Sequence, residues 1–323
     1  MTSTDTREPL PSEQGEDGSF RRKDARFRDF VTADGSSGYK AEPGRYHLYV
    51  SSACPWAHRT MIYRHLKGLE RAISMTIVDP ERGERGWAIT ETHGTTPDHV
   101  NGFTFVSEAY ILSDTDFDGH VTVPVLWDRE RGRIVNNESS EIIRMLESEF
   151  DAFAEHPDRH YLPEELRPEI DELNEFVYEN VNDGVYRTGF ARTQAAYERA
   201  FVRLFDALDE LDARLARSRY LMGSTITEAD WRLFPTLLRF DPVYVGHFKC
   251  NLRRVIDYPQ LSGYLRDLYQ HPGIAQTVDM DHIKRHYYRT HPTLNPRRIV
   301  PVGPALDLAA PHGRDNLAAH NGV

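Results

Sequence analysis

The residue best placed to do chemistry is Cys54, in the segment SSACPWAHRT. A short β-type run, Tyr46–Val50, precedes it, and Pro55, which suits the first turn of a helix, follows it. A cysteine at a helix N-terminus faces backbone N–H groups and the positive end of the helix dipole, and both stabilise the thiolate. A dithiol redox motif would place its second cysteine at Ala57, so the pattern predicts a single nucleophilic thiol. The alternative is a buried structural cysteine.

Two further segments could hold a peptide-like ligand beside this thiol. Pro124 interrupts the β-rich run TVPVL, which is tolerated at an edge strand or at a bend with a cis peptide bond. A bend would leave the backbone groups of Val123 available to pair with an extended peptide. Glu138 and Ser139 lie at a predicted helix start, where N–H groups suit a ligand carboxylate and Glu138 suits an ammonium. The alternative there is helix capping by Asn137 or Ser139.

Composition excludes several classes of protein. The net charge of −11 argues against a nucleic-acid binder, which would carry a basic stripe. The chain has only two cysteines, Cys54 and Cys250, far apart in sequence, which argues against a disulfide framework and a structural zinc site. No apolar run reaches the length of a membrane helix, and the first residues lack the apolar core of a secretory signal. We therefore expect no membrane partner and a cytoplasmic location.

The predicted elements fall into two blocks. Residues 41–155 read β-α-β, then a polar, Gly-rich loop over 79–120, then a β-hairpin and a helix. Residues 165–300 show long stretches of helical period with no convincing strand. We expect an arm, mobile or loosely draped, over 1–40 and a tail over 301–323. The fold class is thus an α/β N-terminal domain followed by an all-α C-terminal domain.

These segments together resemble the glutathionyl-hydroquinone reductases, the Xi class of glutathione transferases. The resemblance covers about residues 20–305. It is carried by SSACPWAHRT, the loop around Trp87, TVPVL, NESSEI, VNDGVYRTGFA, TEADWRLF, RFDPVYVGHFKCN and HIKRHYY. It implies a thioredoxin-like N-terminal domain with a helical domain after it, which agrees with the pattern above.

The resemblance also implies a reaction. Cys54 attacks the sulfur of a glutathionyl-hydroquinone, the hydroquinone leaves, and a second glutathione releases oxidised glutathione from the Cys54 mixed disulfide. The positions that match the family's site are Trp87, Val123, Pro124, Glu138 and Ser139 for glutathione, with Tyr186, Tyr244 and Tyr287 as catalytic tyrosines. Tyr186 is assigned as proton donor and the other two as hydroxyl donors toward the Cys54 thiolate. For each tyrosine the alternative is core packing, and Tyr288 competes with Tyr287 for the last role.

Other functions stay open at this stage. A conjugating transferase would activate glutathione with a Ser or Tyr hydroxyl, and a non-catalytic module on the same fold would need no thiol. The prevalence of arginine over lysine is typical of GC-rich genomes, and some such bacteria use other low-molecular-weight thiols, so the natural thiol is open as well.

Weaker candidates and partners complete the predictions. His282 and His286 have the spacing of two metal ligands on one helix face, but no third ligand is evident, so we expect no metal. Cys250 is expected to be a small buried hydrophobe. The resemblance implies a homodimer formed through the helical domain, and a wide, tyrosine-lined site implies a small aromatic glutathione conjugate as substrate.

Overall fold

The computed structural model describes residue 9 and residues 11–319, and it divides the chain into two compact units. The first unit contains Asp24–His160 and Gln276–Val300, and the second contains Pro11–Lys23, Tyr161–Ala275 and the described residues 301–319. The units do not follow the predicted boundaries, because residues 276–300 belong with the N-terminal block. The domain boundaries given above stay predictions.

A four-stranded sheet in the order β4-β3-β5-β6 forms the centre of the first unit. Strand β3 (Tyr46–Val50) pairs in parallel with β4 (Ser74–Ile77) and antiparallel with β5 (Val125–Asp128), and β6 (Arg133–Asn136) completes the hairpin. All five residues of β3 are buried, as expected for a strand covered on both faces. The parallel β3–β4 pair requires a crossover, which α1 supplies.

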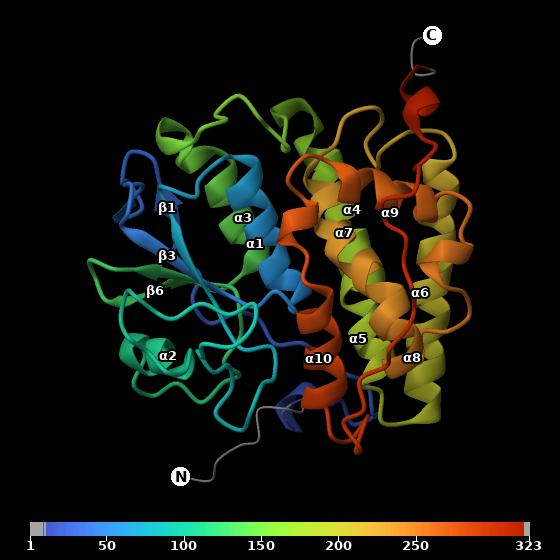
Figure 1. Ribbon diagram of the computed structural model, residues 1–323, viewed down its shortest axis with the longest axis horizontal. Helices are drawn as coiled ribbons and strands as arrows, with labels where there is room; N and C mark the ends of the chain where they lie inside the picture. The colour runs from blue at the N-terminus through green and yellow to red at the C-terminus, as the bar shows by residue number, and fades with distance from the viewer. Residues whose placement is uncertain (1–8, 10, 320–323) are drawn as a thin grey trace. The chain divides into compact units, whose positions relative to one another are not determined.

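Helices α1 (Pro55–Leu66) and α3 (Ser139–Arg144) pack side by side in this unit, as Figure 1 shows. A π-helical turn continues α3 as far as Glu149. The predicted loop over 79–120 contains one short helix, α2 (Ser107–Ser113), and α10 (Met280–Thr290) belongs to the same unit.

The described part of the predicted N-terminal arm is packed. Strands β1 (Val31–Thr32) and β2 (Tyr39–Lys40) pair with each other, and the Phe27 side chain is buried in the same unit. The expectation of a mobile or loosely draped arm is therefore wrong for residues 24–40. Residues 1–8 and 10 lie outside the described part of the chain.

The second unit is built from helices, and its described residues contain no named strand. Its helices, drawn from green to orange in Figure 1, are α4 (Arg167–Val177), α5 (Gly184–Gly189), α6 (Gln194–Leu215), α7 (Glu228–Arg239), α8 (Val245–His247) and α9 (Leu261–Gln270). A capping box is present at the start of α7, where Asp230 accepts hydrogen bonds from the N–H and hydroxyl of Thr227.

Candidate active site

Cys54 occupies the N-cap position of α1, at the carboxyl end of the central strand β3. Its backbone is extended, and its carbonyl accepts the N–H of His58 as the first bond of the helix. The side chain is 8% exposed, and its Sγ donates to the carbonyl oxygen of Val123 at 3.4 Å. The thiol therefore belongs to the N-cap residue of α1, at the end of the helix where a negative charge is favoured.

Val123 and Pro124 come directly before β5, and their peptide bond is cis. Because β5 pairs with both β3 and β6, Pro124 does not belong to an edge strand, and that alternative is wrong. The Val123 carbonyl, one of the backbone groups expected to be available for a ligand, accepts from the Cys54 thiol in this structure. The structure thus places the thiol and this backbone segment within hydrogen-bonding distance.

Glu138 and Ser139 lie at the start of α3 in the same unit. Glu138 is itself the N-cap, accepting from the Ser140 N–H at 3.0 Å and from the Ser140 hydroxyl at 2.8 Å. Asn137 instead accepts the Phe27 N–H, so the alternative of a cap at Asn137 or Ser139 is wrong. Ser139 accepts a hydrogen bond from the guanidinium of Arg59, which is buried on α1.

Trp87 and Tyr287 also belong to the first unit and are both buried. The Trp87 ring stacks on His286 of α10, with 4.9 Å between ring centroids. Within the described residues the Trp87 indole Nε1–H has no hydrogen-bond partner. A buried donor of this kind usually meets water or a ligand. Tyr287 contacts the rings of His286 and His291, while burial raises the pKa of its neighbour Tyr288.

Tyr186 and Tyr244 belong to the second unit, where the structure brings them together. Their ring centroids are 6.1 Å apart in an edge-to-face arrangement, and both rings contact Phe248. Tyr186 lies on α5, whereas Tyr244 ends the π-helical turn after α7.

The weaker sequence candidates all lie in buried, packed surroundings. Cys250 is fully buried, and this burial raises the pKa of its thiol well above the ordinary value, as fits a small buried hydrophobe. His282 Nε2 and His286 Nδ1 each lie within hydrogen-bonding distance of a backbone carbonyl, of His93 and Pro80 respectively. In the described ranges, no group of three or more potential ligand side chains is arranged to hold a metal.

Sequence reasoning missed Arg22 and Asp183, which surround Tyr186. Arg22 Nε donates to Asp183 Oδ1 at 2.8 Å, and the Arg22 guanidinium carbon lies 4.8 Å from the centroid of the Tyr186 ring. No local pattern could have indicated this contact, because Arg22 and Asp183 are 161 positions apart.

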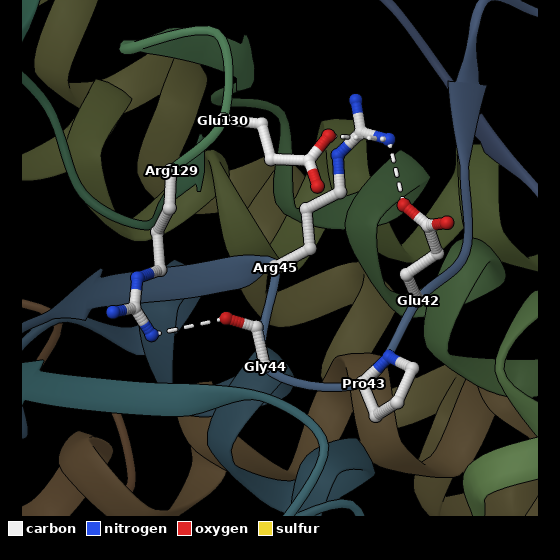
Figure 2. A pocket seen from close by; sticks show the side chains of 6 residues that line it. All are labelled: Glu42, Pro43, Gly44, Arg45, Arg129 and Glu130. Atoms are coloured by element: carbon white, nitrogen blue, oxygen red, sulfur yellow. Dashed lines mark hydrogen bonds and ion pairs between the residues drawn. The ribbon is translucent and has the colours of Figure 1, made fainter.

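A pocket at the opposite end of β3 is shown in Figure 2. Arg45, which directly precedes β3, pairs there with Glu42 at 3.0 Å and Glu130 at 3.3 Å. The Arg129 guanidinium donates to the Gly44 carbonyl. Because its charged groups are paired with one another, this pocket resembles a structural ion-pair cluster rather than a reactive centre.

Sequence comparisons match this arrangement to a family. Residues 53–149 match the glutathione S-transferase N-terminal domain and residues 194–267 the C-terminal domain. The glutathionyl-hydroquinone reductase YqjG of Escherichia coli is 50% identical over 92% of this chain and 93% of its own length. The chain belongs to the Xi class of glutathione S-transferases. A further relative, the glutathionyl-hydroquinone reductase PcpF of Sphingobium chlorophenolicum, is 52% identical over 90% of this chain and 91% of its own length.

Solved structures of Xi-class transferases share the fold. The Xi-class transferase from Natrialba magadii has a TM-score of 0.89 and 51% identity, covering 94% of this chain and 96% of its own. The glutathione-bound structure of YqjG has a TM-score of 0.87 and 51% identity, covering 90% of this chain and 96% of its own. The fold is therefore a thioredoxin-like N-terminal domain with an all-helical C-terminal domain, as predicted. Among the described helices, none has the length and apolar character needed to span a bilayer.

Proposed function

We propose that this Xi-class transferase reduces glutathionyl-hydroquinones to hydroquinones, with Cys54 as the nucleophile. The observation that carries the proposal is the position of Cys54, which is the N-cap residue of α1 and whose thiol contacts the Val123 carbonyl. Two relatives about half identical over nearly the whole chain are named for this activity. A thiolate at a helix N-terminus is the form of cysteine that attacks sulfur.

The reaction proceeds in two thiol-exchange steps. The Cys54 thiolate attacks the glutathione sulfur of the conjugate, forming a Cys54–glutathione disulfide. The electron pair of the broken carbon–sulfur bond goes to the ring carbon, which takes a proton and leaves as hydroquinone. A glutathione thiolate then attacks the glutathione sulfur of the mixed disulfide, so oxidised glutathione leaves and the Cys54 thiolate is restored.

The glutathione moiety binds along the first unit beside Cys54. The Val123 backbone and Pro124 offer an extended edge for its peptide, and Glu138 with Ser139 at the start of α3 holds its γ-glutamyl end. The buried indole N–H of Trp87 supplies a further donor for a glutathione oxygen. Supporting this assignment, all these residues belong to the unit that carries Cys54.

Three tyrosines complete the proposed chemistry. Tyr186 donates the proton to the leaving ring carbon, and Tyr244 and Tyr287 donate hydroxyl hydrogen bonds that favour the Cys54 thiolate. The contact between the rings of Tyr186 and Tyr244 supports a shared role for this pair.

The test of the proposed function is the Cys54→Ser variant, assayed for hydroquinone release from a glutathionyl-hydroquinone. We expect a loss of about 1000-fold or more, since the serine hydroxyl does not form the mixed disulfide. Cys250→Ala is the matched control and should stay within about twofold of the wild type, because Cys250 only packs. Mass spectrometry of the wild type after mixing with oxidised glutathione should show one glutathione adduct on Cys54. Full activity in Cys54→Ser would refute the proposal.

The finer points of the proposal have their own tests. We propose that the substrate is a small aromatic glutathione conjugate, that glutathione is the natural thiol, and that the protein is a cytoplasmic homodimer joined through the helical domain. Turnover of one conjugate with glutathione and with other low-molecular-weight thiols tests the co-substrate, and greater turnover with another thiol would contradict glutathione as the natural thiol.

Light scattering coupled to size-exclusion chromatography tests the oligomeric state, and a monomeric mass would contradict the dimer.

A further inference from the structure

The surroundings of Tyr186 contain a charge arrangement that the proposed reaction has not yet used. Asp183 is 1% exposed and lies just before α5, one helical turn ahead of Tyr186. Its two carboxylate oxygens accept from two different arginines, Arg22 at 2.8 Å and Arg187 at 2.9 Å. Since a buried carboxylate needs such partners, Asp183 fixes both guanidinium groups in place.

Arg22 contacts the Tyr186 ring as well as pairing with Asp183. Its guanidinium carbon lies 4.8 Å from the centroid of the Tyr186 ring, and the Tyr186 side chain is only 8% exposed. Arg187 already pairs with Asp183 from within α5, so a second arginine is not needed to neutralise that carboxylate. A cation over the face of a tyrosine holds the ring in one orientation and stabilises the negative charge that develops when the hydroxyl gives up its proton.

We propose that Arg22, fixed by Asp183, is a positioning residue that orients Tyr186 and stabilises its phenolate as it gives its proton to the leaving hydroquinone carbon. The hydroxyl proton moves to that carbon, the phenolate remains under the guanidinium, and a proton from water restores the hydroxyl. The inference rests on the proposed function and adds the residues that prepare its proton donor.

The charge coupling between these groups supports this geometry. Burial alone would lower the pKa of Arg22, but the charge of Asp183 and its hydrogen bond outweigh burial, and the pKa lies above its ordinary value. Arg22 thus stays positively charged throughout the working pH range. Other titratable groups line the same pocket as Arg22 and Asp183, including Tyr178, Glu179, Arg187, Arg199 and Arg203, and Tyr244 lies beside the Tyr186 ring.

The test separates the two chemical steps. Single-turnover measurements follow hydroquinone release from the conjugate, and a second experiment follows attack of glutathione on preformed Cys54–glutathione disulfide. Arg22→Gln should slow release about tenfold, because the cation over the phenolate is lost. It should leave the second step within about twofold of the wild type, since that step needs no proton on carbon. Equal slowing of both steps would indicate a general structural effect and overturn the inference.

A double-mutant cycle with Tyr186→Phe gives the sharper readout. If Arg22 acts through Tyr186, then Arg22→Gln should change the release rate by less than about twofold in the Tyr186→Phe background. A tenfold loss persisting in that background overturns the inference.

Two further readouts test the charge itself. Arg22→Lys, which keeps the positive charge, should release hydroquinone at least about threefold faster than Arg22→Gln. The fall of the release rate at alkaline pH should move to higher pH in Arg22→Gln, because the phenolate is no longer favoured.

Controls keep failure of this inference distinct from failure of the proposed function. Arg26→Gln removes an exposed arginine that pairs with Asp114 in the other unit, and it should leave both steps unchanged. If Arg22→Gln fails to fold, Asp183→Asn, which keeps the size of the side chain, should slow release about threefold with the second step intact. Loss of the Cys54 adduct in the wild type would refute the proposed function. An intact adduct with an inert Arg22 would refute only this inference.

Discussion

The two cysteines occupy opposite kinds of environment. Cys54 follows strand β3 and is the N-cap residue of α1, so its thiol lies at the positive end of a helix, and the residue remains 8% exposed. Cys250 is fully enclosed near the carbonyl groups of Val185 and Phe248, at 4.0 and 3.9 Å from its sulfur. Burial raises the pKa of Cys250, because the low-dielectric surroundings disfavour the thiolate. The N-cap position of Cys54, more than the small difference in burial, therefore distinguishes the reactive thiol from the packed one.

The largest expected effect is the difference in alkylation rate between the two thiols. With iodoacetamide near pH 7, Cys54 should react at least about 100-fold faster than Cys250, because only a thiolate that the reagent can reach is alkylated. Peptide mass spectrometry of a time course measures both rates in the same sample. Equal rates in the folded protein would contradict the comparison, and equal rates in urea provide the control.

The next prediction concerns His247, which precedes Cys250 in the same enclosed region. Burial, together with the nearby Lys249, lowers the pKa of His247 to about 4. The unfolded chain binds a proton near pH 6.5, which the folded state does not take up until lower pH, so stability is lost as the pH falls below that value. From pH 7 to pH 5 we expect the wild type to lose about 2 kcal/mol of unfolding free energy relative to His247→Gln.

Urea unfolding of both proteins at the two pH values measures this difference. A titration of the His247 imidazole by NMR checks the assignment directly. The prediction fails if the two proteins respond equally to pH.

The smallest expected effect is on stability at Cys250. Replacing Cys250 with serine should lower the unfolding free energy by about 1.5 kcal/mol, because the hydroxyl is more strongly hydrated than the thiol and is buried in the same space. Cys54→Ser should change it by less than about 0.5 kcal/mol, since this position caps a helix and serine is a good cap. Urea denaturation of both variants measures the two changes in unfolding free energy. A larger loss in Cys54→Ser than in Cys250→Ser would contradict the difference between the two environments.

The local patterns predicted the central elements well. Strand β3 has the predicted bounds Tyr46–Val50, and α1 begins at Pro55 directly after the cysteine. These features depend on neighbouring residues only, which is why they can be read from a sequence. The fold class and the family are confirmed by the comparisons. The roles of the individual site residues stay predictions.

Longer stretches were harder to interpret. Residues 165–300 show long stretches of helical period, but α4 ends at Val177 and α5 begins only at Gly184, after a π-helical turn. The π-helical turn Tyr178–Asn182 follows α4 directly and stays helical, so the sequence pattern shows no break there. The packing of residues 24–40 was missed for a similar reason, since their polar composition conceals a few buried anchors such as Phe27 and Val31.

By itself, the sequence determined which thiol follows a strand and begins a helix, and hence where a single nucleophile belongs. Only the tertiary structure decided that this thiol meets Val123, that Arg59 reaches Ser139 and that Arg22 covers Tyr186. The physical reason is the separation along the chain of the residues that interact. Helix starts and strand periods arise from contacts between near neighbours, whereas these pairings depend on how distant segments pack together, which no local pattern encodes.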